Sequence, residues 1–331
     1  MRRRTVGGLA VLALLVVTGC SAAPVQETPG GAGAEKPVVD RAVQPLQPAL
    51  SVTDPHGTRL TLPAPPRRIV CLSGLCDDIV ADLGLVPAGT SNPTLLRHPA
   101  LLGEGGAGVP VVGGSFGSED VESIAVLDPD LVIGLEGVHE TLRPAIERFA
   151  PLWLTEPVTW QESVGYLRAL GALTGRTTEA VAAETRFRAT LADAVDRSHA
   201  AGYAAHPVVL LYGSADSVGV DTANSLKGGL LDQLFDYPFP AKGTDAETAG
   251  NYSLEELLAR GPRTVFVYSL LFGASDRTLS AQLADNPVWA QIPAVRDGRV
   301  HEMHAKLWGT GRGARSLGAI VGEALAAVGR P

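Results

Sequence analysis

The stretch Thr178–Ala200, TEAVAAETRFRATLADAVDRSHA, decides how the rest of the chain is organised. It contains neither glycine nor proline, and Phe187, Leu191 and Val195 recur at four-residue steps, so they share one face of a helix. At about 1.5 Å per residue this helix would span about 35 Å, and Gly202 supplies a natural end to it. The pattern predicts one long helix between two halves of the chain.

Short apolar strands alternate with helices on both sides of this stretch. We expect a hairpin at 51–62, strands at 68–72, 109–112, 131–133, 152–154, 208–212, 264–268 and 300–303, and helices at 77–83, 121–127, 140–149, 228–235, 254–259, near 280 and at 314–328. Such alternation is typical of a mostly parallel, buried sheet. The predicted fold class is therefore α/β, with two Rossmann-like lobes joined by a single long backbone helix and a ligand cleft between the lobes.

The chain begins with the features of a bacterial lipoprotein. Arg2–Arg4 precede the apolar run Val6–Val17, which is shorter than the roughly 20 residues of a membrane helix but fits a secretory signal. The run ends in Val-Thr-Gly-Cys20, which resembles a lipobox whose cysteine is lipidated. We expect residues 1–20 to be a signal peptide and Cys20 to hold the protein at the outer face of the cell membrane by its lipid alone. Ordinary cleavage nearby, with Cys20 removed or inert, is the alternative.

The rest of the chain divides into a spacer and a folded part. Residues 21–48 consist mainly of Ala, Pro, Gly, Val, Gln and Glu and contain no aromatic residue, so we expect a flexible tether. An N-terminal lobe (49–175), a linking helix (176–202) and a C-terminal lobe (203–331) follow. The net charge of −8 offers no basic face, so nucleic acid is not an expected partner.

Two further cysteines, Cys71 and Cys76, follow Cys20. Export would place them in an oxidising compartment, where a local disulfide can form. The loop between them is tight, and geometry could forbid the bond. The sequence leaves both states open, and two cysteines alone make a poor zinc site.

Four segments together resemble a known family. They are Val52–Thr58 leading to Pro65–Val70, Asp120–Gly134, Tyr252–Leu258 and Asn286–Val300. In this order they resemble the helical-backbone substrate-binding proteins of ABC importers, the group that serves iron siderophores, haem and cobalamin. The resemblance implies a monomeric binding protein without catalytic residues, metal site or resident cofactor. It would carry a metal chelate, a ferric siderophore in the first instance, to an ABC permease dimer.

Two glutamates follow from the resemblance. Glu122 and Glu255 match positions that in the family project from the two lobes and meet arginines of the permease. Charge pairs at a rim steer docking and fix orientation more than they add affinity. Each could instead be a solvated carboxylate in the first turn of a helix, which the helix dipole favours. Glu256 lies beside Glu255 and makes the second assignment less specific.

Residues 307–313, LWGTGRG, resemble the tryptophan-containing, glycine-rich loop that faces the cleft in the family. Trp308 would stack on the ligand and Arg312 would pair with an anionic chelate. The alternative is a tryptophan packed under a flexible loop and an arginine facing solvent. Tyr212, Phe116 and Lys227 are further candidate ligand contacts, although a lone surface lysine is common.

The ligand class rests on a departure from the family pattern. Many members of the siderophore branch carry an arginine just before a His-Glu pair, and here Val138 precedes His139 and Glu140. A pocket arginine often found near the strand of Tyr212 is also not apparent. We therefore expect a weakly charged chelate, such as a ferric hydroxamate, over a catecholate. Haem and cobalamin are the alternatives within the same fold.

Two other patterns indicate different chemistry. Residues 113–117, GGSFG, match the nucleophile elbow of a serine hydrolase, with Ser115 as nucleophile and Asp245 and His301 or His304 as partners. The next expected helix does not start directly after Ser115, which disfavours this reading. His301 and His304 also raise the question of a metal or haem ligand, but on a strand they would face opposite sides.

Overall fold

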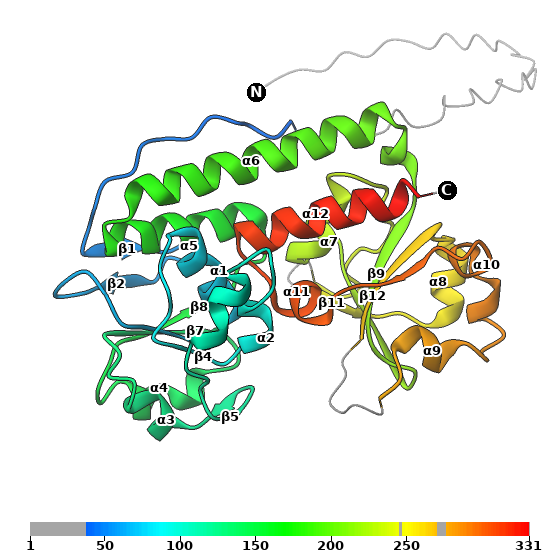
Figure 1. The fold of residues 1–331 in the computed structure, drawn as a ribbon. Coiled ribbons are helices and arrows are strands. Elements are labelled where there is room, and N and C mark those ends of the chain that lie inside the picture. Colours follow the sequence, from blue (N-terminus) through cyan, green and yellow to red (C-terminus); the bar gives the residue numbers. More distant parts are fainter. Residues whose placement is uncertain (1–37, 245–246, 270–275, 331) are drawn as a thin grey trace, which may run out of the picture. The chain divides into compact units, whose positions relative to one another are not determined.

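The computed structural model describes residues 38–244, 247–269 and 276–330. The described residues from 38 onward form one compact unit, in which the strands of the two lobes lie in two separate main sheets (Figure 1). The expected signal peptide and Cys20 lie outside the described residues. None of the helices in the described part of the chain combines the length and apolarity needed to cross a membrane.

The first lobe is built on a parallel sheet of four strands in the order β4-β3-β7-β8. Its strands are β3 (Ile69–Cys71), β4 (Gly89–Thr90), β7 (Leu131–Leu135) and β8 (Leu152–Thr155). Its helices are α1 (Gly74–Asp82), α2 (Pro93–Leu96), α3 (Val121–Ala125), α4 (Arg143–Ile146) and α5 (Trp160–Thr174). The strands are buried almost throughout, as expected for a parallel sheet that is covered on both faces.

Two small hairpins complete this lobe. The predicted N-terminal hairpin consists of β1 (Ser51–Thr53) and β2 (Arg59–Thr61), and β5 (Gly114–Ser115) pairs with β6 (Ser118–Glu119). The predicted strand at 109–112 is wrong, since only a bridge between Thr90 and Val111 forms there.

The second lobe has a mixed sheet in the order β11-β10-β9-β12-β13. Its strands are β9 (Val208–Ser214), β10 (Ser217–Asp221), β11 (Ala249–Asn251), β12 (Thr264–Ser269) and β13 (Val300–Glu302). Its helices are α7 (Leu226–Asp232), α8 (Leu254–Arg260), α9 (Leu279–Leu283), α10 (Pro293–Arg296), α11 (Ala305–Thr310) and α12 (Ala314–Val328). β9, β12 and β13 are parallel, as predicted, whereas β10 and β11 add an antiparallel edge that was not predicted.

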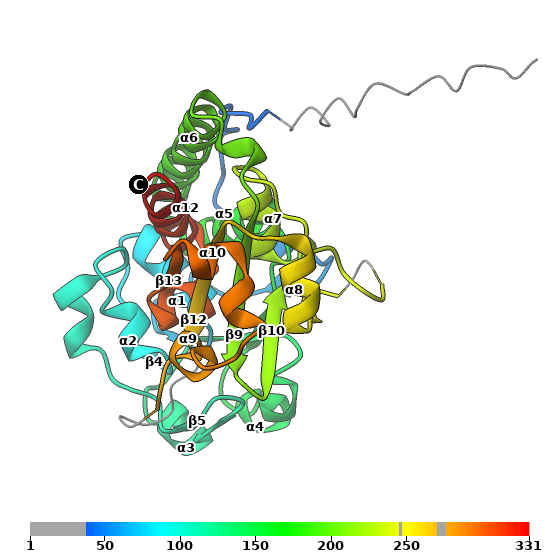
Figure 2. The ribbon, with the colours of Figure 1, turned by 90° about the vertical axis from the view of Figure 1, so that its right-hand side faces the viewer.

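The predicted long helix is confirmed as α6 (Thr177–Ala200). Phe187, Leu191 and Val195 are buried along it, as their spacing predicts. α6 packs against α5 and α12, and Figures 1 and 2 both show α12 running beside it. The backbone of the fold is therefore a pair of neighbouring helices in place of one isolated rod.

The predicted tether ends too late in the sequence. Residues 38–48 pack on the folded unit: Arg41 forms ion pairs with Asp193 and Asp196 of α6, at 2.8 and 3.3 Å. The Arg168 guanidinium donates hydrogen bonds to the carbonyls of Gln44 and Pro45. Val39 is buried as well. Apolar and hydrogen-bonding contacts thus make these residues part of the domain, and the boundary at residue 48 is wrong.

α12 begins with a cap that comes from another part of the chain. Its N-cap residue is Gly313, which has no side chain to cap the helix. Instead, the Asp78 carboxylate of α1 accepts hydrogen bonds from the amides of Gly313 (3.2 Å) and Ser316 (2.9 Å). Asp78 is fully buried, and burial raises its pKa to about 6. One carboxylate therefore joins α1 of the first lobe to the helix beside α6.

This cap predicts a pH-dependent stability. The folded chain keeps the Asp78 proton up to about pH 6, whereas an unfolded aspartate loses it near pH 4. The free energy of unfolding should therefore fall as pH rises from about 4 to about 6, by at most about 1.4 kcal/mol per pH unit from this group. Urea unfolding across this range should show a flatter profile for Asp78→Asn. The exposed control Asp216→Asn should follow the wild type, and parallel profiles for Asp78→Asn would contradict the assignment.

Candidate ligand-binding site

Two stacked tyrosines lie beside a group of polar side chains in the second lobe. Tyr212 on β9 and Tyr268 on β12 are neighbours in the parallel register, and their rings stack with centroids 5.4 Å apart and an interplanar angle of 14°. Gly219 lies opposite Tyr212 on β10, where any Cβ would collide with the tyrosine ring. The glycine thus allows Tyr212 to lie over the sheet.

A buried acid and a buried lysine surround these rings. The Tyr268 hydroxyl donates a hydrogen bond to Asp221 Oδ2 (3.2 Å). Lys227 Nζ lies 5.8 Å from the centroid of the Tyr268 ring and donates to the Gly309 carbonyl (3.4 Å). Burial lowers the pKa of Lys227 to about 8, with Arg312 acting in the same direction and Asp221 opposing it. Lys227 is thus a buried cation, and the acid that most favours its charged form is Asp221 of the same lobe.

An ion pair connects this cluster to the first lobe. Arg312 follows α11, and its Nε lies 3.7 Å from Oε1 of Glu156, the residue that follows β8. The two side chains are only 20% and 33% exposed, respectively. Burial raises the pKa of Glu156, although Arg312 and Lys227 oppose the shift. We call Glu156, Tyr212, Asp221, Lys227, Tyr268 and Arg312 the interlobe cluster.

The lobes also touch through their backbones beside this cluster. Gly74 is the first residue of α1, and a Cβ at this position would collide with the Thr310 carbonyl of α11. Arg312 itself donates to the Thr310 carbonyl through Nη1 (3.2 Å). A larger residue at position 74 would push α1 away from the segment that leads from Thr310 to Arg312.

Three of the five predicted ligand contacts lie in the interlobe cluster: Tyr212, Lys227 and Arg312. Sequence reasoning missed Glu156, Asp221 and Tyr268. Glu156 and Tyr268 each lie at the carboxyl end of a predicted parallel strand, and this position is itself a signal for a ligand site. Asp221 ends a strand that was not predicted, so the sequence offered no comparable signal for it.

The prediction that Trp308 stacks on a ligand is wrong. Residues 305–310 form the helix α11, not a loop, and the Trp308 side chain is fully buried. Its ring stacks on Phe266 (5.3 Å between centroids), and its indole N–H donates to Glu323 Oε2 (2.7 Å). His304 caps the helix, because its Nδ1 accepts a hydrogen bond from the Leu307 amide.

Phe116 lies at the tip of the β5–β6 hairpin, with 66% of its surface exposed. Its ring meets the edge of the buried His139 ring at 5.8 Å. Phe116 does not belong to the interlobe cluster, so its role as a ligand contact stays a prediction. Ser115 lies in the same hairpin and not at a strand-to-helix turn, so the nucleophile elbow of a hydrolase is not formed. The proposed acid Asp245 lies outside the described residues.

The two glutamates assigned to docking are exposed in the first turns of α3 and α8. Glu256, the neighbour of Glu255, is engaged elsewhere. Its carboxylate accepts the Ser253 amide in a capping box and pairs with Lys242 at 2.7 Å. This difference favours Glu255 as the residue available to a partner, and the docking role of both glutamates stays a prediction.

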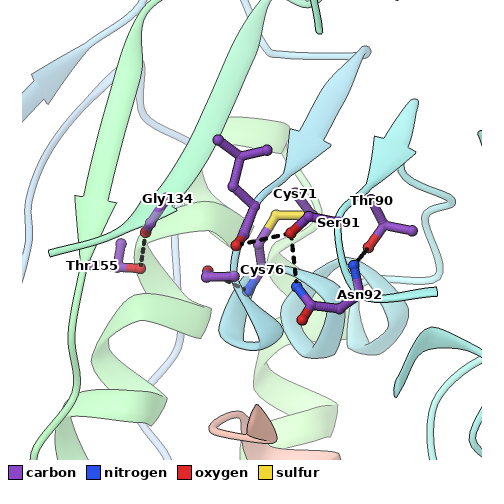
Figure 3. Close-up of a disulfide and its surroundings, with 9 residues drawn as sticks. Cys71, Cys76, Thr90, Ser91, Asn92, Gly134 and Thr155 are labelled. Atoms are coloured by element: carbon purple, nitrogen blue, oxygen red, sulfur yellow. Dashed lines mark hydrogen bonds between the residues drawn. A yellow bond between two sulfur atoms is a disulfide. The ribbon is translucent and has the colours of Figure 1, made fainter. Parts of the chain in front are cut away.

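Cys71 and Cys76 are joined in a disulfide and are fully buried. The bond ties the end of β3 to the first turn of α1, with Cα atoms 5.3 Å apart (Figure 3). Next to it, the Ser91 hydroxyl donates to the Leu72 carbonyl and Asn92 donates to the Ser91 hydroxyl. The disulfide therefore stabilises the segment from which Gly74 meets the second lobe.

Metal ligation receives no support from the histidines. Within the described ranges, no group of three or more His, Cys, Asp or Glu residues could hold a metal ion. His304 uses Nδ1 to cap α11, and His301 lies on β13 beside Phe266. His304 therefore has a structural role, and His301 packs against an aromatic ring of the core.

Two surface hollows lie apart from the interlobe cluster. One of about 520 Å³ lies where α1, α6 and α12 meet, and one of about 800 Å³ lies beside β2 and β8. Neither is lined by Tyr212, Lys227 or Arg312. We place the candidate site at the interlobe cluster, because it combines two stacked rings of the second lobe with partly or fully buried charges from both lobes. The cleft itself stays a prediction.

Comparison with known proteins gives the class. Residues 69–307 match the family described as periplasmic binding protein. The chain belongs to this family, in its helical-backbone form, and is accordingly a substrate-binding protein and not an enzyme.

Several individual proteins are similar to this chain over most of its length. The Fe(3+)-citrate-binding protein YfmC of Bacillus subtilis is 22% identical over 309 residues, which span 92% of this chain and 90% of YfmC. The Fe(3+) dicitrate-binding periplasmic protein FecB of Escherichia coli is 24% identical over 286 residues, 84% and 88% of the two chains. The structure of Staphylococcus aureus SirA with staphyloferrin B superposes with a TM-score of 0.68 at 18% identity, over 85% of this chain and 98% of SirA.

The assignment of Trp308 to the core can be tested by Trp308→Phe. This change keeps an aromatic ring against Phe266 but leaves Glu323 without its indole partner. We expect the free energy of unfolding to fall by about 1–3 kcal/mol and the ligand affinity to stay unchanged. Urea unfolding and ligand titration of the same samples measure both. A large loss of affinity with unchanged stability would return Trp308 to the binding site.

Proposed function

We propose that this protein is an extracytoplasmic lipoprotein, anchored through Cys20, that binds a ferric chelate and delivers it to an ABC permease. The observation that carries the proposal is the interlobe cluster, in which Arg312 pairs with Glu156 of the opposite lobe and Lys227 lies near the ring that stacks on Tyr212. Aromatic faces and desolvated cations are suited to a compact metal chelate with oxygen ligands. Names of relatives that bind ferric citrate or staphyloferrin B support an iron chelate as the ligand class.

Within that class, the charges of the cluster favour a chelate of low net charge. Lys227 and Arg312 face the acids Asp221 and Glu156, so the cluster supplies no excess of positive charge when both acids are ionised. A ferric hydroxamate fits this balance better than a highly anionic catecholate. Haem and cobalamin remain the comparison ligands from the same fold.

The ligand class is tested by titrating the purified full chain with a ferric trihydroxamate, ferric citrate, a ferric catecholate, haem and cobalamin. We expect the trihydroxamate to bind most tightly, with a Kd in the range of about 1 μM or below. Calorimetry gives the affinity of each ligand. Binding of haem or cobalamin alone would contradict the proposal.

Delivery to the permease would use Glu122 and Glu255, which pair with basic residues of the partner. In cells, Glu122→Ala combined with Glu255→Ala should lower chelate uptake by about tenfold or more, because rim charges steer docking. Ligand affinity of the purified variant should not change. Glu256→Gln is the matched control, since Glu256 caps α8 and should leave uptake close to wild type. Normal uptake by the double variant at equal expression would remove both glutamates from docking.

A further inference from the structure

The interlobe ion pair places an acid of the protein where an acidic ligand would bind. Arg312 Nε lies 3.7 Å from Glu156 Oε1, and both side chains are largely removed from solvent. A ligand carboxylate that approaches Arg312 must therefore displace Glu156 or share the guanidinium with it. Because charges interact more strongly where water is partly excluded, this competition carries weight in the binding equilibrium.

Two further acids, Glu136 and Glu162, lie near Glu156 in the first lobe, and both pair with His56. Glu136 lies close enough to disfavour the ionised form of Glu156, whereas His56 favours it. His56 Nδ1 is 2.9 Å from Glu136, and its Nε2 is 3.5 Å from Glu162. The first-lobe side of the cluster is therefore acidic, and its counter-charges come mostly from Arg312 and Lys227.

Glu156 differs in this respect from Asp221, the other acid of the cluster. Asp221 accepts a hydrogen bond from Tyr268 and faces Lys227, both within the second lobe. Glu156 belongs to the first lobe, and its Oε2 is buried without a hydrogen-bond partner in the described residues. The ionised form of Glu156 is thus favoured mainly by Arg312 of the other lobe. Neutralising Glu156 should therefore break no hydrogen bond within the first lobe.

We infer that Glu156 determines the charge of the ligand: it acts as an internal counter-ion that occupies Arg312 and disfavours chelates with free carboxylates. The inference rests on the proposed function and deepens it. When Glu156 is neutral, Arg312 becomes available to a ligand carboxylate, with which an arginine forms strong, directional hydrogen bonds. Neutral and weakly charged chelates do not need Arg312 and bind equally well in both states.

The test compares two ferric chelates of opposite character on the full chain. Ferric citrate carries anionic carboxylates, and a ferric trihydroxamate without carboxylates serves as the uncharged comparison. Glu156→Gln should tighten ferric citrate by about tenfold or more and change the trihydroxamate by less than about threefold. Glu136→Gln is the matched control: it removes a nearby acid that does not contact Arg312, and it should change either affinity by less than about threefold.

A second variant shows whether the effect passes through Arg312. In an Arg312→Gln background, Glu156→Gln should no longer improve ferric citrate binding, because the two residues act as a coupled pair. Thermal unfolding checks that each variant is folded.

The outcomes separate the two claims. If the wild type binds a ferric chelate but Glu156→Gln leaves ferric citrate unchanged, or tightens both chelates equally, the inference is overturned and the proposed function stands. If the gain persists in the Arg312→Gln background, Glu156 acts by some other route and the inference also fails. If neither the wild type nor any variant binds a ferric chelate, the proposed function and the inference fall together.

Discussion

The folded part of this protein depends on the burial of one face of α6. Phe187 and Leu191 lie in the core, where α6 meets α5 and α12, and each such side chain contributes about 1.5–3 kcal/mol of burial energy. Because α12 starts directly after Gly313 and is capped by Asp78, its position fixes where the preceding Arg312 can lie. The helix pair that joins the lobes therefore also positions one half of the candidate site.

The other half of the site follows from strand topology. Carboxyl ends of parallel strands share one edge of a sheet, and ligand sites of α/β proteins gather there. Glu156 follows β8 and Tyr268 lies near the end of β12, so each lobe presents such an edge. The close contact of Gly74 with Thr310, next to the Cys71–Cys76 disulfide, joins α1 of the first lobe to α11 of the second. Under the proposed function, ligand recognition rests on a balance of charges more than on an excess of one sign.

Much of the fold could be predicted, because the spacing of apolar residues and the positions of glycine and proline reflect local backbone preferences. α6 and α12 begin and end within a residue or so of the predicted positions, since glycine and apolar spacing mark both helices. The glycine-rich sequence after Leu307 misled us about Trp308, because a cap from His304 and contact with Phe266 override the low helix propensity of glycine. Residues 38–48 looked like a tether by composition, and only tertiary contacts such as Arg41 with Asp193 reveal their packing. For the same reason the pairing of Glu156 with Arg312, far apart in the chain, was out of reach of sequence patterns.

Under the proposed function, a ferric chelate binds where the two lobes meet. A crystal structure of the protein with a ferric trihydroxamate locates the iron by its anomalous scattering. We expect the iron to lie between the lobes, with the chelate against Tyr212 and within reach of Lys227 and Arg312. An iron bound instead in the hollow beside β2 and β8, with the interlobe cluster unchanged, would contradict it.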